Sequence, residues 1–208
     1  VSRIDESKEK KNKGDFCLWK FSKAGEPKWK SIFGDGRPGW HIEDTAIAEK
    51  FFGTQYDVHG GARDLIFPHH EAEIAQMEAV SGKKPMVRYW LHSGFLTVKG
   101  QKMAKSLGNF ITIRDFISRH GPRLLRFMVL KTHYRSPLDY NENVVIQAKR
   151  ELERIDEFID KIQNAKCKSQ NDNSKFKNDF EQAMEDDFNT PKAMATIFEL
   201  INQKTYDK

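Results

Sequence analysis

The basic loop of residues 99–109, KGQKMAKSLGN, is the feature that most restricts how this chain can fold. It directly follows residues 94–98, which predict a short strand, so the loop stands at that strand's carboxyl end. Ligands of open α/β sheets bind at this edge. Lys102, Lys105 and Ser106 can bring two ammonium groups and several backbone N–H donors to one triphosphate. The pattern predicts an α/β fold with a phosphate site, and a solvated surface loop is the alternative.

Composition restricts the compartment and the class of partner. The chain has 208 residues, and 35 Lys and Arg against 30 Asp and Glu give a net charge of +5, which suits a polyanionic partner without requiring one. Cys17 and Cys167 lie far apart and lack metal-type spacing, which indicates a reducing compartment rather than a disulfide framework. The sequence has neither a long apolar run nor an apolar leader. We therefore expect a cytoplasmic protein that does not bind membranes.

Apolar periodicity predicts short strands and helices in the first half of the chain and helices in the second. Strands are expected over residues 15–20, 56–59 and 94–98, and residues 86–91 form a further segment before the last of these. Helices are expected over residues 42–52, 68–80, 113–120, 122–130 and 143–162, with a last helix starting near residue 190. Residues 132–140 are predicted to be irregular, and residues 164–177 to form a polar, flexible connection.

His69 and Glu73 are the first candidates for a metal site. They are four positions apart on a predicted helix and so share one face. An imidazole nitrogen and a carboxylate oxygen make a pair that can bind zinc, although a surface ion pair has the same spacing. Asp44 and His59 fall near the ends of neighbouring elements on the same side of the inferred sheet. Three or four ligand-type residues could therefore converge.

Several ordered motifs carry a resemblance to a known family. They are GRPGWHIE at 36–43, HGG at 59–61, DLIFPHHE at 64–71, YWLHSG at 89–94, KMAKSLGNF at 102–110, HYRS at 133–136 and EDDFNTP at 185–191. In order and spacing they resemble the cysteinyl-tRNA synthetases, which are class I aminoacyl-tRNA synthetases. The segment KMAKS resembles the class I signature Lys-Met-Ser-Lys-Ser, with Ala104 in place of serine.

This resemblance implies ATP-dependent activation of L-cysteine, with Mg²⁺, and transfer of the cysteinyl group to tRNA(Cys). Lys102 and Lys105 would be catalytic, and both would bind ATP together with Ser106. Trp40 and His59 resemble residues that shape the cysteine pocket. A packed aromatic ring and a core imidazole are the alternatives for these two positions.

The resemblance also implies a zinc ion that binds the thiolate of the substrate, with His69 and Glu73 as two of its ligands. Asp44 stands where most members of the family have cysteine. A carboxylate is a harder ligand than a thiolate, so we expect weaker zinc binding or a site without zinc.

The implied fold is the C-terminal half of a Rossmann-like class I catalytic domain followed by an α-helical region. Residues 1–14 would be a linker and 15–113 the second half of the nucleotide-binding domain. Residues 114–142 would form a connecting region like the family's stem-contact region, and 143–208 the start of a helical tRNA-binding region.

The sequence lacks the His-Ile-Gly-His-like segment that class I enzymes pair with the lysine loop. We therefore expect a fragment of a monomeric synthetase, lacking N-terminal and C-terminal parts and inactive alone. Two other functions stay open. A ligase that joins cysteine to an amino sugar resembles the family in the same motifs, and a non-catalytic tRNA-binding module would keep the basic face without the pocket. The segment 185–191, leading into a further helix, favours a tRNA partner.

Overall fold

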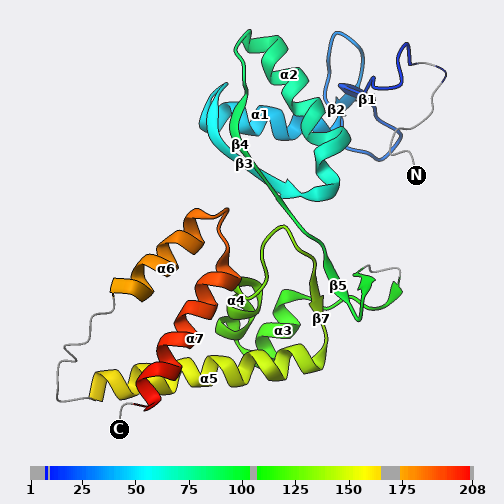
Figure 1. Cartoon of the computed structure of the whole chain (residues 1–208). Coiled ribbons are helices and arrows are strands. Elements are labelled where there is room, and N and C mark those ends of the chain that lie inside the picture. Colours follow the sequence, from blue (N-terminus) through cyan, green and yellow to red (C-terminus); the bar gives the residue numbers. More distant parts are fainter. Residues whose placement is uncertain (1–7, 9, 104–106, 165–173, 207–208) are drawn as a thin grey trace. The chain divides into compact units, whose positions relative to one another are not determined.

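The computed structural model describes residue 8 and residues 10–103, 107–164 and 174–206 (Figure 1). By packing, the chain divides into two compact units, Val1–His92 and Ser93–Lys208. This division concerns packing only, so the domain boundaries inferred from the resemblance stay predictions.

The first unit combines two pairs of strands with two helices. Its elements are β1 (Trp19–Phe21), β2 (Gly36–Pro38), α1 (Trp40–Phe52), β3 (Tyr56–Ala62), the short helical turns η1 (Arg63–Leu65) and η2 (Ile66–His70), α2 (Glu71–Ser81) and β4 (Val87–Ser93). Strand β1 pairs antiparallel with β2, β3 pairs with β4, and α1 packs against α2. A small core of Met77, Met86 and Val87 lies between α2 and β4.

The helix predicted from Pro68 is interrupted at its start. Phe67 has extended backbone angles, φ −137° and ψ 132°, because a residue before proline is disfavoured in the α conformation. The regular helix α2 therefore begins at Glu71 and ends before Gly82, which adopts the left-handed conformation common after helices. This break places His69 and His70 in the turn η2 at the amino end of α2 rather than within the helix.

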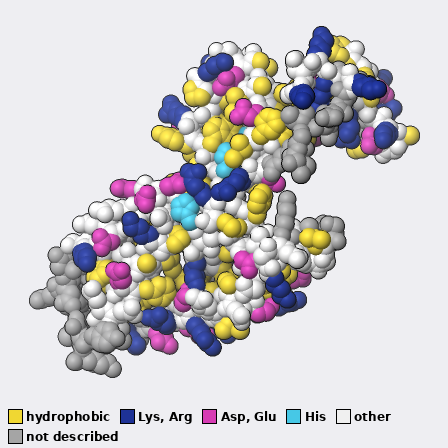
Figure 2. Space-filling model, turned by 45° about the vertical axis from the view of Figure 1, so that its right-hand side comes forward, with side chains coloured by type: hydrophobic (Ala, Val, Ile, Leu, Met, Phe, Trp, Pro, Cys, Tyr) yellow, Lys and Arg dark blue, Asp and Glu magenta, His cyan; other side chains and the backbone are white. Residues whose placement is uncertain are grey.

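Much apolar surface of the first unit is open to solvent. Figure 2 shows hydrophobic side chains, in yellow, exposed among charged ones. On the hairpin of β1 and β2 they include Ile32, which is 94% exposed, and the aromatic side chains Phe21, Trp29 and Phe33. Burial in this unit is thus concentrated under α2, beside the residues of the candidate site.

The second unit has a small sheet and five helices among its described residues. Its strands are β5 (Leu96–Val98), β6 (Gln101–Lys102) and β7 (Leu138–Tyr140), and its helices are α3 (Ile113–His120), α4 (Pro122–Leu130), α5 (Glu142–Asn164), α6 (Ser174–Glu185) and α7 (Thr190–Tyr206). Strand β5 is central, antiparallel to β6 and parallel to β7. Helix α5 packs against α4 and α7, and α6 packs against α7.

Two sequence predictions were wrong in this unit. Residues 138–140 form strand β7 rather than part of an irregular segment, and residues 174–177 belong to helix α6 rather than to a connection. Residues 165–173 of that predicted connection lie outside the described residues. Strand β7 is only three residues long and has a polar residue at its centre, so its partner β5 defines it more than its own pattern does. Helix α6 begins with a polar turn that resembles a loop, although Phe176, Phe180 and Ala183 follow helical spacing.

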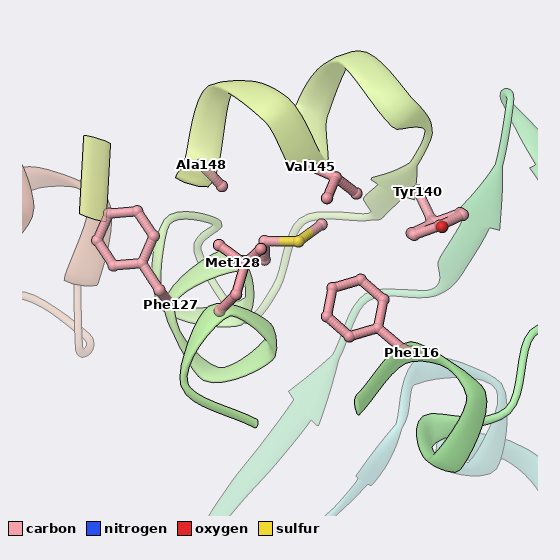
Figure 3. Close-up of a cluster of buried hydrophobic side chains, with 7 residues drawn as sticks. Phe116, Phe127, Met128, Tyr140, Val145 and Ala148 are labelled. Atoms are coloured by element: carbon pink, nitrogen blue, oxygen red, sulfur yellow. The ribbon is translucent and has the colours of Figure 1, made fainter. Parts of the chain in front are cut away.

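The core of the second unit lies where α3, α4, α5 and the end of β7 meet (Figure 3). Its buried side chains are Phe116, Leu124, Phe127, Met128, Tyr140, Val145 and Ala148. Helix α3 is capped by Thr112, whose hydroxyl accepts a hydrogen bond from the backbone N–H of Asp115, and α4 begins with Pro122. The core therefore fixes β7 relative to α5, and with it the strand β5 that leads into the lysine loop.

Asp187 joins the turn between α6 and α7 to residues far away in the sequence. Its backbone has a positive φ of 53°, as does that of Phe188. Its carboxylate accepts hydrogen bonds from the Tyr134 hydroxyl at 2.7 Å and from two nitrogens of the Arg135 guanidinium. The Arg135 bonds, and then that of Tyr134, lower the pKa of Asp187 to about 2. This carboxylate thus holds the 133–136 motif against the 185–191 motif.

Replacing Asp187 with asparagine should make the stability of the protein depend less on pH in the acidic range. The folded pKa lies below the ordinary value of 3.8, so the stabilisation is complete above that value and is lost as the pH falls towards about 2. Urea midpoints of Asp187→Asn should be below those of the wild type at about pH 5 and approach them near about pH 2. The exposed Asp160→Asn variant controls for loss of a negative charge. Parallel curves for Asp187→Asn and wild type would contradict this account.

Candidate metal centre

Three elements of the first unit bring the predicted ligand residues together. Helix α1 supplies Asp44, β3 supplies His59, and η2 with α2 supplies His69 and Glu73. These residues line a cavity of about 400 Å³. Helical spacing predicted the pair on η2 and α2, and the structure brings Asp44 and His59 to it, as the sequence indicated it could.

His69 is at the centre of the group. Its Nε2 atom lies 2.8 Å from Oδ2 of Asp44 and 2.8 Å from Oε1 of Glu73. On the other side of the ring, its Nδ1 atom lies 2.7 Å from Nδ1 of His41, so one of these two nitrogens must carry the proton. If Nδ1 of His69 carries it in the neutral ring, Nε2 presents a lone pair to two carboxylates. That arrangement is favourable with a cation between them or with a proton on one of the carboxylates.

The surroundings of Glu73 are the second observation that favours a cation at this site. Its side chain is completely buried, and neither carboxylate oxygen receives a well-aligned hydrogen bond from the residues that the structure describes. Burial, and then the charge of Asp44, raises the pKa of Glu73 to about 7. A buried carboxylate without donors is costly unless it is neutralised or binds a cation. The ligand-type atoms of Asp44, His69 and Glu73 lie within 4.8 Å of one another, so the residues fit a metal ion.

A second group shares the same carboxylate. His59, His70 and Glu73 also place one ligand-type atom each within 4.8 Å of the others, and His59 Nε2 lies 3.6 Å from Oε2 of Glu73. Burial lowers the pKa of His59, and burial together with the neighbouring imidazoles lowers that of His70 to about 4. Both rings are therefore neutral at neutral pH, the form in which imidazole binds metals.

Contacts to neighbouring side chains fix the orientation of these imidazoles. Nδ1 of His59 lies 2.6 Å from the Tyr56 hydroxyl, and Nδ1 of His70 lies 2.8 Å from Nε2 of His92. Trp90 lies 4.8 Å from His59 and 4.9 Å from His70 between ring centroids. Such contacts orient metal-binding imidazoles in proteins.

The backbone of β3 forms a close wall of the cavity. A Cβ atom added at Gly61 would come within 2.8 Å of the His70 ring. Glycine is therefore needed there because the strand approaches the imidazole too closely for any side chain. The HGG motif thus combines a candidate site residue with the glycine that makes room for its neighbour.

Sequence reasoning missed part of the histidine cluster. His41, His70, His92 and Trp90 had no predicted role, although all four lie in motifs that were noted for other reasons. The alternation of Trp90 and His92 along one strand, which puts both on the same face, was a usable signal. Trp40, predicted for the cysteine pocket, has its ring 4.6 Å from that of His69 and is 61% exposed.

The predicted phosphate-site residues can be placed only in part. Lys102 ends strand β6 in the second unit, and its side chain lies outside the described residues, as do Lys105 and Ser106. Their catalytic and ATP-binding roles stay predictions.

Comparison with known proteins identifies the family of this chain. Residues 1–150 match the model described as tRNA synthetases class I (C) catalytic domain. The chain belongs to this family. Residues 179–204 of this class I synthetase chain also match the DALR domain model. The resemblance drawn from the motifs is thereby confirmed. The roles of individual residues are not decided by family membership.

The sequence of this class I synthetase chain is similar to that of proteins named cysteine–tRNA ligase. It is 49% identical to the one from Carboxydothermus hydrogenoformans over 207 residues, covering 96% of this chain and 44% of the relative. It is 50% identical to one from Methanococcus maripaludis over 214 residues, covering 97% and 45%. The chain thus spans less than half the length of these relatives.

Solved structures support the fold of a class I synthetase. LeuRS of Agrobacterium radiobacter K84, in a ternary complex with tRNA and LeuAMS, matches 84% of this chain and 29% of its own, with a TM-score of 0.63 and 16% identity. Mycobacterium tuberculosis methionyl-tRNA synthetase in complex with methionyl-adenylate matches 86% and 42%, with a TM-score of 0.61 and 14% identity. The predicted α/β fold with a helical C-terminal part is confirmed. In the described part of the chain, no helix has the length and apolar character needed to cross a membrane.

Proposed function

We propose that this chain serves in ATP-dependent activation of L-cysteine and its transfer to tRNA(Cys). The observation that carries the proposal is the identity of about half of all residues to cysteine–tRNA ligases across nearly the whole chain. The group of Asp44, His69 and Glu73, in which His69 and Glu73 are buried, supports it independently, because it suits recognition of a thiol through a metal. ATP, accompanied by Mg²⁺, L-cysteine and tRNA(Cys) are the corresponding substrates. A cytoplasmic location and action as a monomer belong to the same proposal.

The reaction requires charge stabilisation more than covalent help from the protein. An oxygen of the cysteine carboxylate attacks the α-phosphorus of ATP, and the bond to pyrophosphate breaks. Lys102 and Lys105 offset the negative charge that grows on the departing pyrophosphate, and Ser106 binds the nucleotide beside them. A ribose hydroxyl of the tRNA end then attacks the adenylate carbonyl, which releases AMP.

Selection of cysteine falls to the residues of the candidate metal centre. A cation held by Asp44, His69 and Glu73 would supply a Lewis-acid contact for sulfur, which distinguishes cysteine from serine where shape differs little. Trp40 presents an exposed ring beside His69 and can cover the substrate side chain. His59, held by its contact with Tyr56, offers a neutral imidazole on the opposite side of Glu73.

The test uses a complete synthetase that contains this chain. Cysteine should drive exchange of pyrophosphate into ATP, serine should not, and the cysteinyl group should appear on tRNA(Cys). Condensation of cysteine with an amino sugar in place of tRNA would contradict the proposal and identify the sugar ligase. Binding of tRNA with no exchange under any condition would identify a non-catalytic module.

A further inference from the structure

The lysine loop begins with a tight turn whose backbone needs support. Lys99 and Gly100 join β5 to β6 and have φ values of 50° and 74°. Val98 pairs with Gln101 on either side of them. Two positive φ values in a two-residue hairpin are typical of a type I′ turn. Glycine adopts this conformation readily, but lysine does so at a cost, so contacts outside the turn must hold it.

Asp139 provides such contacts from the neighbouring strand β7. It lies opposite Thr97 in the parallel register of β5 and β7. Its Oδ1 atom accepts a hydrogen bond from the backbone N–H of Gly100 at 2.7 Å and another from the Thr97 hydroxyl at 2.8 Å. The backbone N–H of Lys99 also donates to the carbonyl of Tyr140, at 3.2 Å. The turn is thus held on both of its central residues by β7.

Asn141 fixes the orientation of this carboxylate. Its side-chain N–H donates to Oδ2 of Asp139 at 3.0 Å, while its side-chain oxygen accepts from the backbone N–H of Val144 at 3.0 Å and so caps the start of α5. Both ends of the Asn141 amide are therefore engaged. These donors stabilise the ionised form, and the bond from Gly100, followed by those from Thr97 and Asn141, lowers the pKa of Asp139. These contacts connect the turn at Lys99 and Gly100 to the amino end of α5, more than forty residues further along the chain.

We propose that Asp139 is a positioning residue for the lysine loop. Lys102 pairs with Thr97, which pairs with Asp139, so the three residues lie side by side across β6, β5 and β7. By holding Gly100 and Thr97, the carboxylate fixes the turn that precedes β6. It thereby fixes the backbone position of Lys102 at the end of that strand. Asp139 acts through this backbone and does not touch substrate. The inference rests on the proposed role of the loop in cysteine activation.

The test compares Asp139→Ala with wild type in a complete synthetase that contains this chain. The kcat of cysteine-dependent pyrophosphate exchange should fall about 10- to 100-fold, because misplacing a reacting group by about 1 Å can cost about 100-fold in rate. The KM for cysteine should stay unchanged, because the residues proposed to bind cysteine lie in the first unit. In a Lys102→Ala background, Asp139→Ala should cause little further loss, since both act on the same group. Asp156→Ala, which removes the partner of Arg123, is the control and should keep wild-type kcat.

A second readout uses the 208-residue chain itself. Hydrogen exchange at the Gly100 amide should be faster in Asp139→Ala than in wild type, because the amide loses its acceptor. This measurement needs no activity, so it decides the positioning even if cysteine-dependent exchange is absent and the proposed function fails. An unchanged kcat in Asp139→Ala would overturn the proposal, and so would an unchanged rate of hydrogen exchange at the Gly100 amide. A loss of kcat in the Lys102→Ala background as large as in the wild-type background would also overturn it. If Asp139→Ala lacks a cooperative melting transition, Asp139→Asn replaces it, with the same pattern expected at smaller size.

Discussion

Replacing Lys105 with alanine in a complete synthetase that contains this chain should remove about 2–4 kcal/mol of transition-state stabilisation, or about 30- to 1,000-fold in the rate of cysteine activation. The ammonium group is expected to meet charge that develops on pyrophosphate, so the effect belongs to kcat rather than to cysteine binding. Single-turnover formation of the adenylate measures it. The melting temperature should match that of the wild type.

Lys83→Ala is a suitable control, because Lys83 is an exposed lysine just beyond α2. It removes the same charge from the chain and should leave adenylate formation unchanged. Normal kinetics for Lys105→Ala would assign that residue to a solvated loop and remove the main support for a phosphate site there.

The second large effect is expected at Glu73. Glu73→Gln keeps the shape of the side chain but removes its charge, and the affinity for Zn²⁺ should fall about 100-fold because one ligand of the group is lost. Metal titration of the purified chain measures the change. Without metal the variant should be no less stable than wild type, because it removes a buried charge that lacks hydrogen-bond donors. Equal zinc affinity in the two proteins would exclude Glu73 as a ligand.

Asp44→Cys tests the same centre in the opposite direction. A thiolate is a softer ligand than a carboxylate, so zinc should bind more tightly to this variant than to wild type. Elemental analysis after dialysis compares their zinc content. Stoichiometric zinc in wild type that Asp44→Cys does not tighten would make Asp44 a full ligand and contradict the argument from softness. If a complete synthetase prefers cysteine over serine without any metal, selection must rest on Trp40 and His59.

Local spacing predicted those parts of the chain in which a single element carries the information. The helices at 113–120 and 122–130 follow from their own apolar spacing around Gly121. The four-residue spacing of His69 and Glu73 predicted their proximity, although His69 lies in the turn η2 before the regular helix. Strand β7 could not be predicted in this way, because its three residues become a strand only through pairing with β5. The role proposed for Asp139 was hidden for the same reason.

At the candidate metal centre, too, local spacing predicted some features and contacts between distant segments determined the others. The sequence indicated that Asp44 and His59 could converge with His69, but it could not give the pairing of His41 with His69 or of His70 with His92. These contacts join residues 22 and 28 positions apart and depend on how η2 packs against β4 and α1. They are tertiary properties, which no local periodicity records.

The exposure of the Asp44, His69 and Glu73 side chains decides where the centre can be altered without disturbing the fold. Those of Glu73 and His69 are 0% and 6% exposed, so a substitution that changes the shape of either side chain disturbs packing as well as the proposed ligand set. That of Asp44 is 43% exposed, so a substitution at this position disturbs packing less. Replacements at position 44 can therefore change the proposed ligand set while leaving the packing of the first unit largely unchanged.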